Sequence, residues 1–116
     1  MQTSSTKEDS LTYVAAELQY MQGNYTDAAA GLKDYLDNYC DGGRYCTAAQ
    51  FFCADAYYQA GDRNAALKEF KTLCEIKGNP YMETALMRAA ELTYDREEYD
   101  DAMKYFRRLL KQSSLR

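Results

Sequence analysis

The chain has 116 residues and a net charge of −4, and it contains no histidine. This length predicts one domain, residues 1–116, with enough chain to bury a hydrophobic core. Nucleic acid is not expected to be the main partner, because phosphate binding favours a basic surface. Without histidine the chain lacks the commonest general base and metal ligand, so we expect no enzymatic activity, no metal and no cofactor.

Targeting and membrane segments are not expected from the sequence. No stretch approaches the roughly 18 apolar residues of a membrane span, and no basic-then-apolar leader opens the chain. The sequence leaves the compartment open. The chain is periplasmic if it is a segment of an envelope protein, and otherwise cytoplasmic.

Long runs rich in Ala, Leu, Glu, Lys, Tyr and Met predict an all-α fold. Gly23-Asn24 and Gly61-Asp62 are expected to separate paired helices, because glycine ends a helix in the left-handed conformation and Asn or Asp caps the next. The third pair has Asp95-Arg96-Glu97 at this place, without glycine. Asn79 followed by Pro80 is expected to begin a helix as its cap and first-turn proline. Apolar residues at three- and four-residue spacing predict helices near residues 7–22, 25–39, 45–60, 63–77, 80–95 and 98–113.

One side-chain pattern recurs three times, with Ala28, Ala66 and Ala102 in equivalent positions. Other equivalent sets are an earlier alanine, a tyrosine and a large apolar residue: Ala16, Ala54 and Ala90; Tyr20, Tyr58 and Tyr94; Leu32, Phe70 and Phe106. One helical hairpin cannot bury its apolar face alone, so the copies must stack. We predict a right-handed α-solenoid of three antiparallel helical hairpins, with six helices and repeats at about residues 7–40, 45–78 and 80–113.

These sets of equivalent positions, which we call columns, resemble the pattern of the tetratricopeptide repeat family. Its Ala-x3-Phe pattern is matched by Ala66 with Phe70 and by Ala102 with Phe106, and its first-helix pattern by residues 54–57. The resemblance covers about residues 8–112, although the family's usual period is about 34 residues and this one is longer. The long period and tyrosine-rich columns are similar to bacterial envelope-associated versions, including the periplasmic proteins that accompany the Tol–Pal system. The resemblance implies a protein-binding scaffold.

In this family the first helix of each repeat lines a concave groove that binds a partner segment. Carried onto this chain, the resemblance implies a groove of Tyr13, Glu17, Tyr20, Met21, Phe51, Asp55, Tyr58, Gln59, Met87, Glu91, Tyr94 and Asp95. Glu17, Asp55 and Glu91 form one acidic column, so the expected partner is a protein or peptide segment that is apolar and carries Lys or Arg. The other interpretation is that the tyrosines pack between hairpins and the acids are solvated.

The function predicted from these features is a protein-interaction module. The alternative is a structural segment of a longer tetratricopeptide array or a self-associating solenoid, because the last helix reaches Leu109-Leu110 without an evident polar cap. This helix also has a basic stripe that serves an anionic partner or simply complements the helix dipole: Lys104, Arg107, Arg108 and Lys111.

The four cysteines have neither a C-x2-C pair nor a histidine complement, so their spacing is not typical of a metal site. Cys53 and Cys74 fall in apolar columns and are expected to be core residues. Cys40 and Cys46 flank a glycine-containing turn and are near enough in sequence for a disulfide in an oxidising compartment. The sequence leaves open whether they are oxidised.

Overall fold

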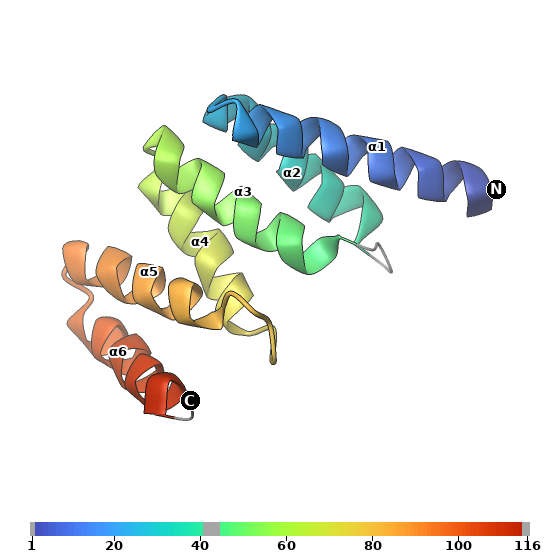
Figure 1. Cartoon of the computed structure of the whole chain (residues 1–116). Helices are drawn as coiled ribbons and strands as arrows, with labels where there is room; N and C mark the ends of the chain where they lie inside the picture. Colours follow the sequence, from blue (N-terminus) through green and yellow to red (C-terminus); the bar gives the residue numbers. More distant parts are fainter. Residues whose placement is uncertain (1, 41–44, 115–116) are drawn as a thin grey trace.

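The computed structural model describes residues 2–40 and 45–114, with side chains between residues 8 and 113 of these ranges. The described residues form six α-helices: α1 (Gln2–Met21), α2 (Tyr25–Tyr39), α3 (Cys46–Ala60), α4 (Arg63–Cys74), α5 (Met82–Asp95) and α6 (Tyr99–Ser114). The helices pair into three hairpins that follow one another along the molecule (Figure 1). The predicted all-α solenoid of helical hairpins is confirmed.

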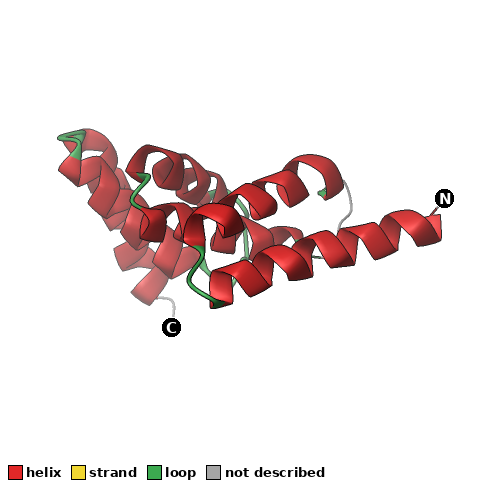
Figure 2. Ribbon diagram, turned by 90° about the horizontal axis from the view of Figure 1, so that it is seen from above, coloured by secondary structure: helices red, strands yellow, loops and turns green. Residues whose placement is uncertain are grey.

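Each helix packs mainly against its neighbours in sequence, so α2 contacts both α1 and α3, and α4 contacts both α3 and α5. We call the packing between the first and second hairpins, centred on the α2–α3 contact, the first joint. The packing between the second and third hairpins, centred on the α4–α5 contact, is the second joint. The N-terminal part of α1 extends past the other helices (Figure 2). No helix in the described part of the chain is long and apolar enough to cross a membrane.

The connection between α4 and α5 differs from its prediction. Helix α5 begins at Met82, not at Pro80, and α4 ends at Cys74. The Asn79 side chain explains both differences, because its Nδ2 donates to the carbonyls of Leu73 and Ile76 at the end of α4. Its Oδ1 accepts from the backbone N–H of Tyr81. The N-cap of α5 is Tyr81, so the prediction that Asn79 caps this helix with Pro80 in its first turn is wrong. Asn79 instead bonds carbonyls at and just after the end of α4 and the N–H of Tyr81 that leads into α5.

The three turns inside the hairpins share a left-handed residue. Gly23 and Gly61 have φ angles of 81° and 89°, and Glu97 stands at the equivalent position with a φ of 62°. A side chain makes this conformation costly, so the third turn keeps the geometry of the first two without their glycine. Asp62 caps α4 through the N–H of Ala65, as predicted. Asn24 stands at the N-cap of α2, as predicted, but its side chain makes no capping hydrogen bond and donates to Gln19 and Gln22 instead.

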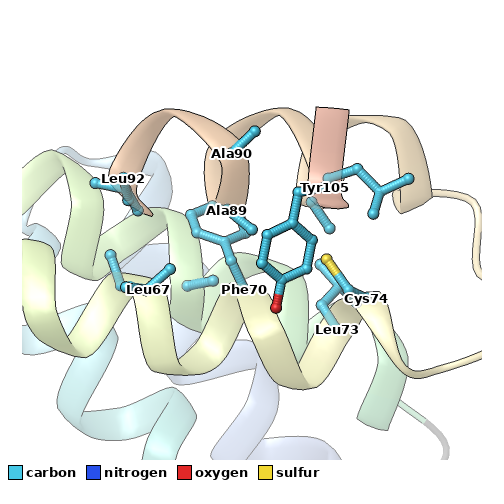
Figure 3. Packing of buried hydrophobic residues seen from close by; sticks show 12 residues of the cluster. Leu67, Phe70, Leu73, Cys74, Ala89, Ala90, Leu92 and Tyr105 are labelled. Carbon is cyan, nitrogen blue, oxygen red and sulfur yellow. The ribbon is translucent and has the colours of Figure 1, made fainter. Parts of the chain in front are cut away.

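Small residues allow close packing inside the hairpins, and larger ones fill the joints. The alanines Ala28, Ala54, Ala66 and Ala90 are fully buried. At Gly31, an added Cβ would lie 2.9 Å from the Cβ of Ala16, so α1 and α2 approach as closely as their backbones allow. The second joint is filled by side chains from α4, α5 and α6, including Phe70, Leu73, Leu92 and Tyr105 (Figure 3). Burial of this apolar surface is the main force that holds the hairpins together.

The cysteines fall into two pairs. Cys53 and Cys74 are buried free thiols, which confirms their prediction as core residues. Burial raises the pKa of the Cys53 thiol to about 12 and that of Cys74 to about 11, so both stay protonated and unreactive near neutral pH. Cys40 and Cys46 form a disulfide with a Cα–Cα distance of 5.5 Å, which joins the end of α2 to the start of α3.

Candidate partner-binding site

The predicted groove residues of the first two repeats mostly contact the neighbouring repeat. The hydroxyl of Tyr20, on α1, donates to the carboxylate of Asp55, on α3. Burial and this hydrogen bond raise the pKa of Tyr20 above its ordinary value. Asp55 is only 8% exposed, which fits a charged group held by a nearby donor. Asp55 therefore joins two repeats and presents little surface to a partner.

Tyr13 and Phe51 occupy equivalent positions in the first and second repeats, and both lie in stacks between hairpins. The ring centroid of Tyr13 is 4.4 Å from that of Tyr45, with an angle of 6° between the ring planes. Phe51 stacks on Tyr81 with the same distance and angle. Tyr13 also donates to Glu17 at 3.2 Å. These aromatic side chains pack as the alternative interpretation of the columns describes.

A hollow of about 290 Å³ is lined by residues of α3, α4, α5 and α6. Four of the twelve predicted groove residues line it, together with Arg63 and Phe106: Tyr58, Glu91, Tyr94 and Asp95. The Tyr94 ring is 57% exposed and touches only the edge of the Tyr99 ring among the aromatic side chains of the described residues. The third repeat therefore exposes the tyrosine at Tyr94, whereas its first-repeat equivalent, Tyr20, is half-buried and bonds Asp55.

Two arginines already pair with the acids of this hollow. Arg63 lies 3.0 Å from Asp95, and Arg88 lies 3.1 Å from Glu91. The guanidinium of Arg88 also lies over the Tyr58 ring, 4.3 Å from its centroid. Neither arginine was predicted from the sequence, because neither recurs at equivalent positions of the other repeats. The three-residue spacing of Arg88 and Glu91 on one helix was a signal for that pair.

The remaining predicted residues are exposed along the same face. Met21 and Gln59 occupy the position of Asp95 in the first and second repeats, and both are exposed. Met87 is exposed on α5. The twelve residues thus divide into a packed set, centred on Tyr13, Tyr20, Phe51 and Asp55, and an accessible set that is densest in the third repeat.

The basic stripe of the last helix is partly used inside the fold. Arg108 donates to the Glu75 carboxylate at 3.1 Å and to the Cys74 carbonyl at 2.9 Å, so it ties α6 to the end of α4. Lys104 and Arg107 are exposed. Within the described ranges, no group of three or more Cys, Asp or Glu side chains is placed to hold a metal ion.

Comparison with known proteins agrees with this architecture. The sequence model of the family described as tetratricopeptide repeat-like domain matches residues 1–113. No curated protein matches the chain at a significant level. Repeats of this kind are protein-interaction modules and are generally not catalytic, whereas the narrower resemblance to Tol–Pal-associated proteins stays a prediction. Since the match spans nearly the whole chain and the structure has the expected helical hairpins, the chain belongs to the tetratricopeptide repeat-like domain family.

Proposed function

We propose that the chain binds a segment of a partner protein in a groove along α1, α3 and α5, with the main contacts in the hollow of the third repeat. The observation that carries this proposal is the exposed ring of Tyr94 beside the carboxylates of Glu91 and Asp95. Exposed tyrosines supply large contact area at a low entropic cost and are enriched among the residues that dominate binding energy. Gln59 and Met21 extend this accessible face toward the first repeat.

The chemistry of the hollow favours a segment that is apolar and carries Lys or Arg. Tyr94 and Met87 offer apolar surface, and methionine adapts to irregular shapes. The Arg63–Asp95 and Arg88–Glu91 pairs are both partly exposed, so each contributes little to stability and exchanges readily for an incoming cation. Arg88 already lies over the Tyr58 ring, which supports a surface that takes a cation against an aromatic face.

The test is capture of partners from the soluble and envelope fractions of the source organism, with the chain immobilised. The chain is compared with a double variant, Glu91→Lys with Tyr94→Ala, and with the control Ala30→Glu. Ala30 is exposed on α2, at the position of the exposed Lys68 and Lys104, and α2 carries none of the predicted groove residues. Circular dichroism confirms that all three are equally helical.

A partner held by the chain and by Ala30→Glu, but lost by the double variant, supports the groove. We expect the affinity for a peptide from that partner to fall at least about tenfold in the double variant, which is about 1.4 kcal/mol. Binding should also weaken as salt is raised, because exposed charges are screened. A partner held equally by the double variant contradicts the proposal.

A further inference from the structure

At the two joints, α3 and α5 use equivalent positions to pack on the preceding hairpin. On α3, three small residues are buried against the preceding hairpin: Ala49, Cys53 and Ala56. On α5, the equivalent buried residues are Ala85, Ala89 and Leu92. The equivalent residues of α1 are Leu11, Ala15 and Leu18, and all three are exposed, Leu18 by 53%. Helix α1 thus carries an apolar face that its counterparts use to pack on another hairpin.

The opposite end of the molecule carries the complementary face. At the joints, α2 and α4 bury large apolar residues against the next helix, among them Leu32, Tyr35, Phe70 and Leu73. The equivalent positions of α6 are Phe106 and Leu109, which are only partly buried. They are flanked by Met103 and by Leu110, which is 71% exposed. The exposed face of α6 therefore corresponds to the faces that α2 and α4 present to the next hairpin.

We propose that α1 of a second copy of the chain docks on α6 and continues the solenoid head to tail. Both halves of the joint are present on one chain, and they are the same column positions that form the two joints inside it. The internal interfaces identify the occupant. Helix α1, with Leu11, Ala15 and Leu18 on one face, would pack on α6 as α3 packs on α2 and as α5 packs on α4. Such a contact joins two different surfaces of the chain. Further copies can therefore add at both ends, unless the rotation between neighbouring copies closes the assembly into a ring.

One polar contact between the first two repeats has equivalent residues at the two ends of the solenoid. Tyr20 of the first repeat donates to Asp55 of the second. Tyr94 is the equivalent tyrosine of the third repeat, and its side chain is exposed. The acid equivalent to Asp55 is Glu17 on α1. The register therefore places Tyr94 of one copy opposite Glu17 of the second copy.

The proposed interface lacks one feature of the internal joints. The ring that stacks on Tyr13 or Phe51 comes from Tyr45 or Tyr81. In the sequence, the position of Tyr45 and Tyr81 is a lysine in the first repeat, and the position of Tyr13 and Phe51 is Met87 in the third, so the register offers no ring stack. A single helix-on-helix interface without this stack is small. We therefore expect weak self-association, with half-saturation between about 10 µM and 1 mM.

The test measures mass against concentration, by sedimentation or light scattering, for the chain and two variants with one end blocked. Leu18→Glu blocks the α1 face, and Leu110→Glu blocks the α6 face. Both residues are exposed, so the fold of each variant is expected to survive, which circular dichroism checks. We expect the chain to self-associate and each variant alone to be monomeric. The two variants mixed in equal amounts should form a species of twice the monomer mass and nothing larger, because each retains the face that the other has lost.

Ala30→Glu, on neither face, should self-associate like the unaltered chain. A chain that stays monomeric up to 1 mM overturns the proposal and assigns the faces to a further hairpin or to a different helical protein. Dimers of Leu110→Glu alone overturn it in favour of an α1–α1 contact, and dimers of Leu18→Glu alone in favour of an α6–α6 contact. The test uses neither Glu91 nor Tyr94, so its failure is distinguishable from failure of the proposed groove.

Discussion

The two joints of the molecule reach one geometry by different chemistry. Each places an aromatic ring of one repeat on a ring of the next, at 4.4 Å and 6° in both cases. The first joint is rich in tyrosine and is closed by the Cys40–Cys46 disulfide. The second is filled largely by aliphatic side chains and is connected through Asn79. The repeat therefore determines which positions are in contact at a joint, whereas the residue types that stabilise the contact differ between the two joints.

The largest fully buried side chain of the first joint, Tyr35, has a hydrogen bond to its hydroxyl inside the joint. The Tyr35 ring is fully buried, and its hydroxyl accepts from the backbone N–H of Tyr45 at 3.0 Å. Its ring lies near those of Tyr13 and Tyr39. In the second joint the equivalent of Tyr35 is Leu73, which has no polar atom to satisfy. The first joint should accordingly respond to pH and to reducing agents, and the second to loss of apolar volume.

The largest expected effect is at the second joint. Phe70→Ala removes a fully buried ring and should lower the free energy of unfolding by about 3–5 kcal/mol. Urea unfolding followed by circular dichroism measures this. Lys68→Ala, an exposed change two residues away on the same helix, is the control and should change stability by less than about 0.5 kcal/mol. A loss below about 1 kcal/mol for Phe70→Ala would mean that the second joint is not the apolar core described.

Alkaline pH should weaken the fold, with a strong contribution from the first joint. Burial raises the pKa of Tyr35 and of Cys53 to about 12, above the ordinary values of 10.0 and 9.0. The folded state thus favours the protonated forms. Their stabilisation is fully present below about pH 9 and is lost as the pH rises toward 12. Urea midpoints between pH 8 and 11 should fall, and Tyr35→Phe should make the fall shallower. A midpoint independent of pH would contradict this.

Breaking the disulfide separates the joints further. Replacement of Cys40 and Cys46 by serine should cost about 2 kcal/mol, because the closed loop is short. Hydrogen exchange should speed up at α2 and α3 more than at α5. A reducing agent should reproduce this loss in the unaltered chain and have no effect on the double serine variant. Equal acceleration at both joints would show that the disulfide does not act on the first joint alone.

The smallest expected effect concerns the third turn. Glu97 is left-handed where the other two turns have glycine, so Glu97→Gly relieves backbone strain. We expect a gain of roughly 0.5–1 kcal/mol, measured by urea unfolding. The matched change is Gly61→Ala, which introduces the same strain into the second turn and should destabilise by a similar amount. Destabilisation by Glu97→Gly would mean that the Glu97 side chain contributes more than its strain costs.

The helices and the repeat were predictable because their signals are local. Apolar residues at three- and four-residue spacing mark the helix faces, and Gly23 and Gly61 mark turns. Each of these signals can be recognised within a short stretch of sequence. The tertiary partners were not predictable. Tyr20 and Asp55 lie 35 residues apart, and a column shows which residues are equivalent but not which ones touch. This is why one acidic column contains both the buried Asp55 and the accessible Glu91. The double role of Asn79 was missed because it depends on where α4 ends.

The central functional claim is that a partner lies along α1, α3 and α5. Its most direct test places a photo-crosslinking amino acid at Gln59, which is exposed on α3 away from both ends of the solenoid, or at Ala30 on α2. Irradiation of each variant with the captured partner, followed by mass measurement, locates the contact. The account predicts an adduct with the partner at position 59 and none at position 30. An adduct at position 30 without one at position 59 would place the partner on α2 and contradict the proposed groove.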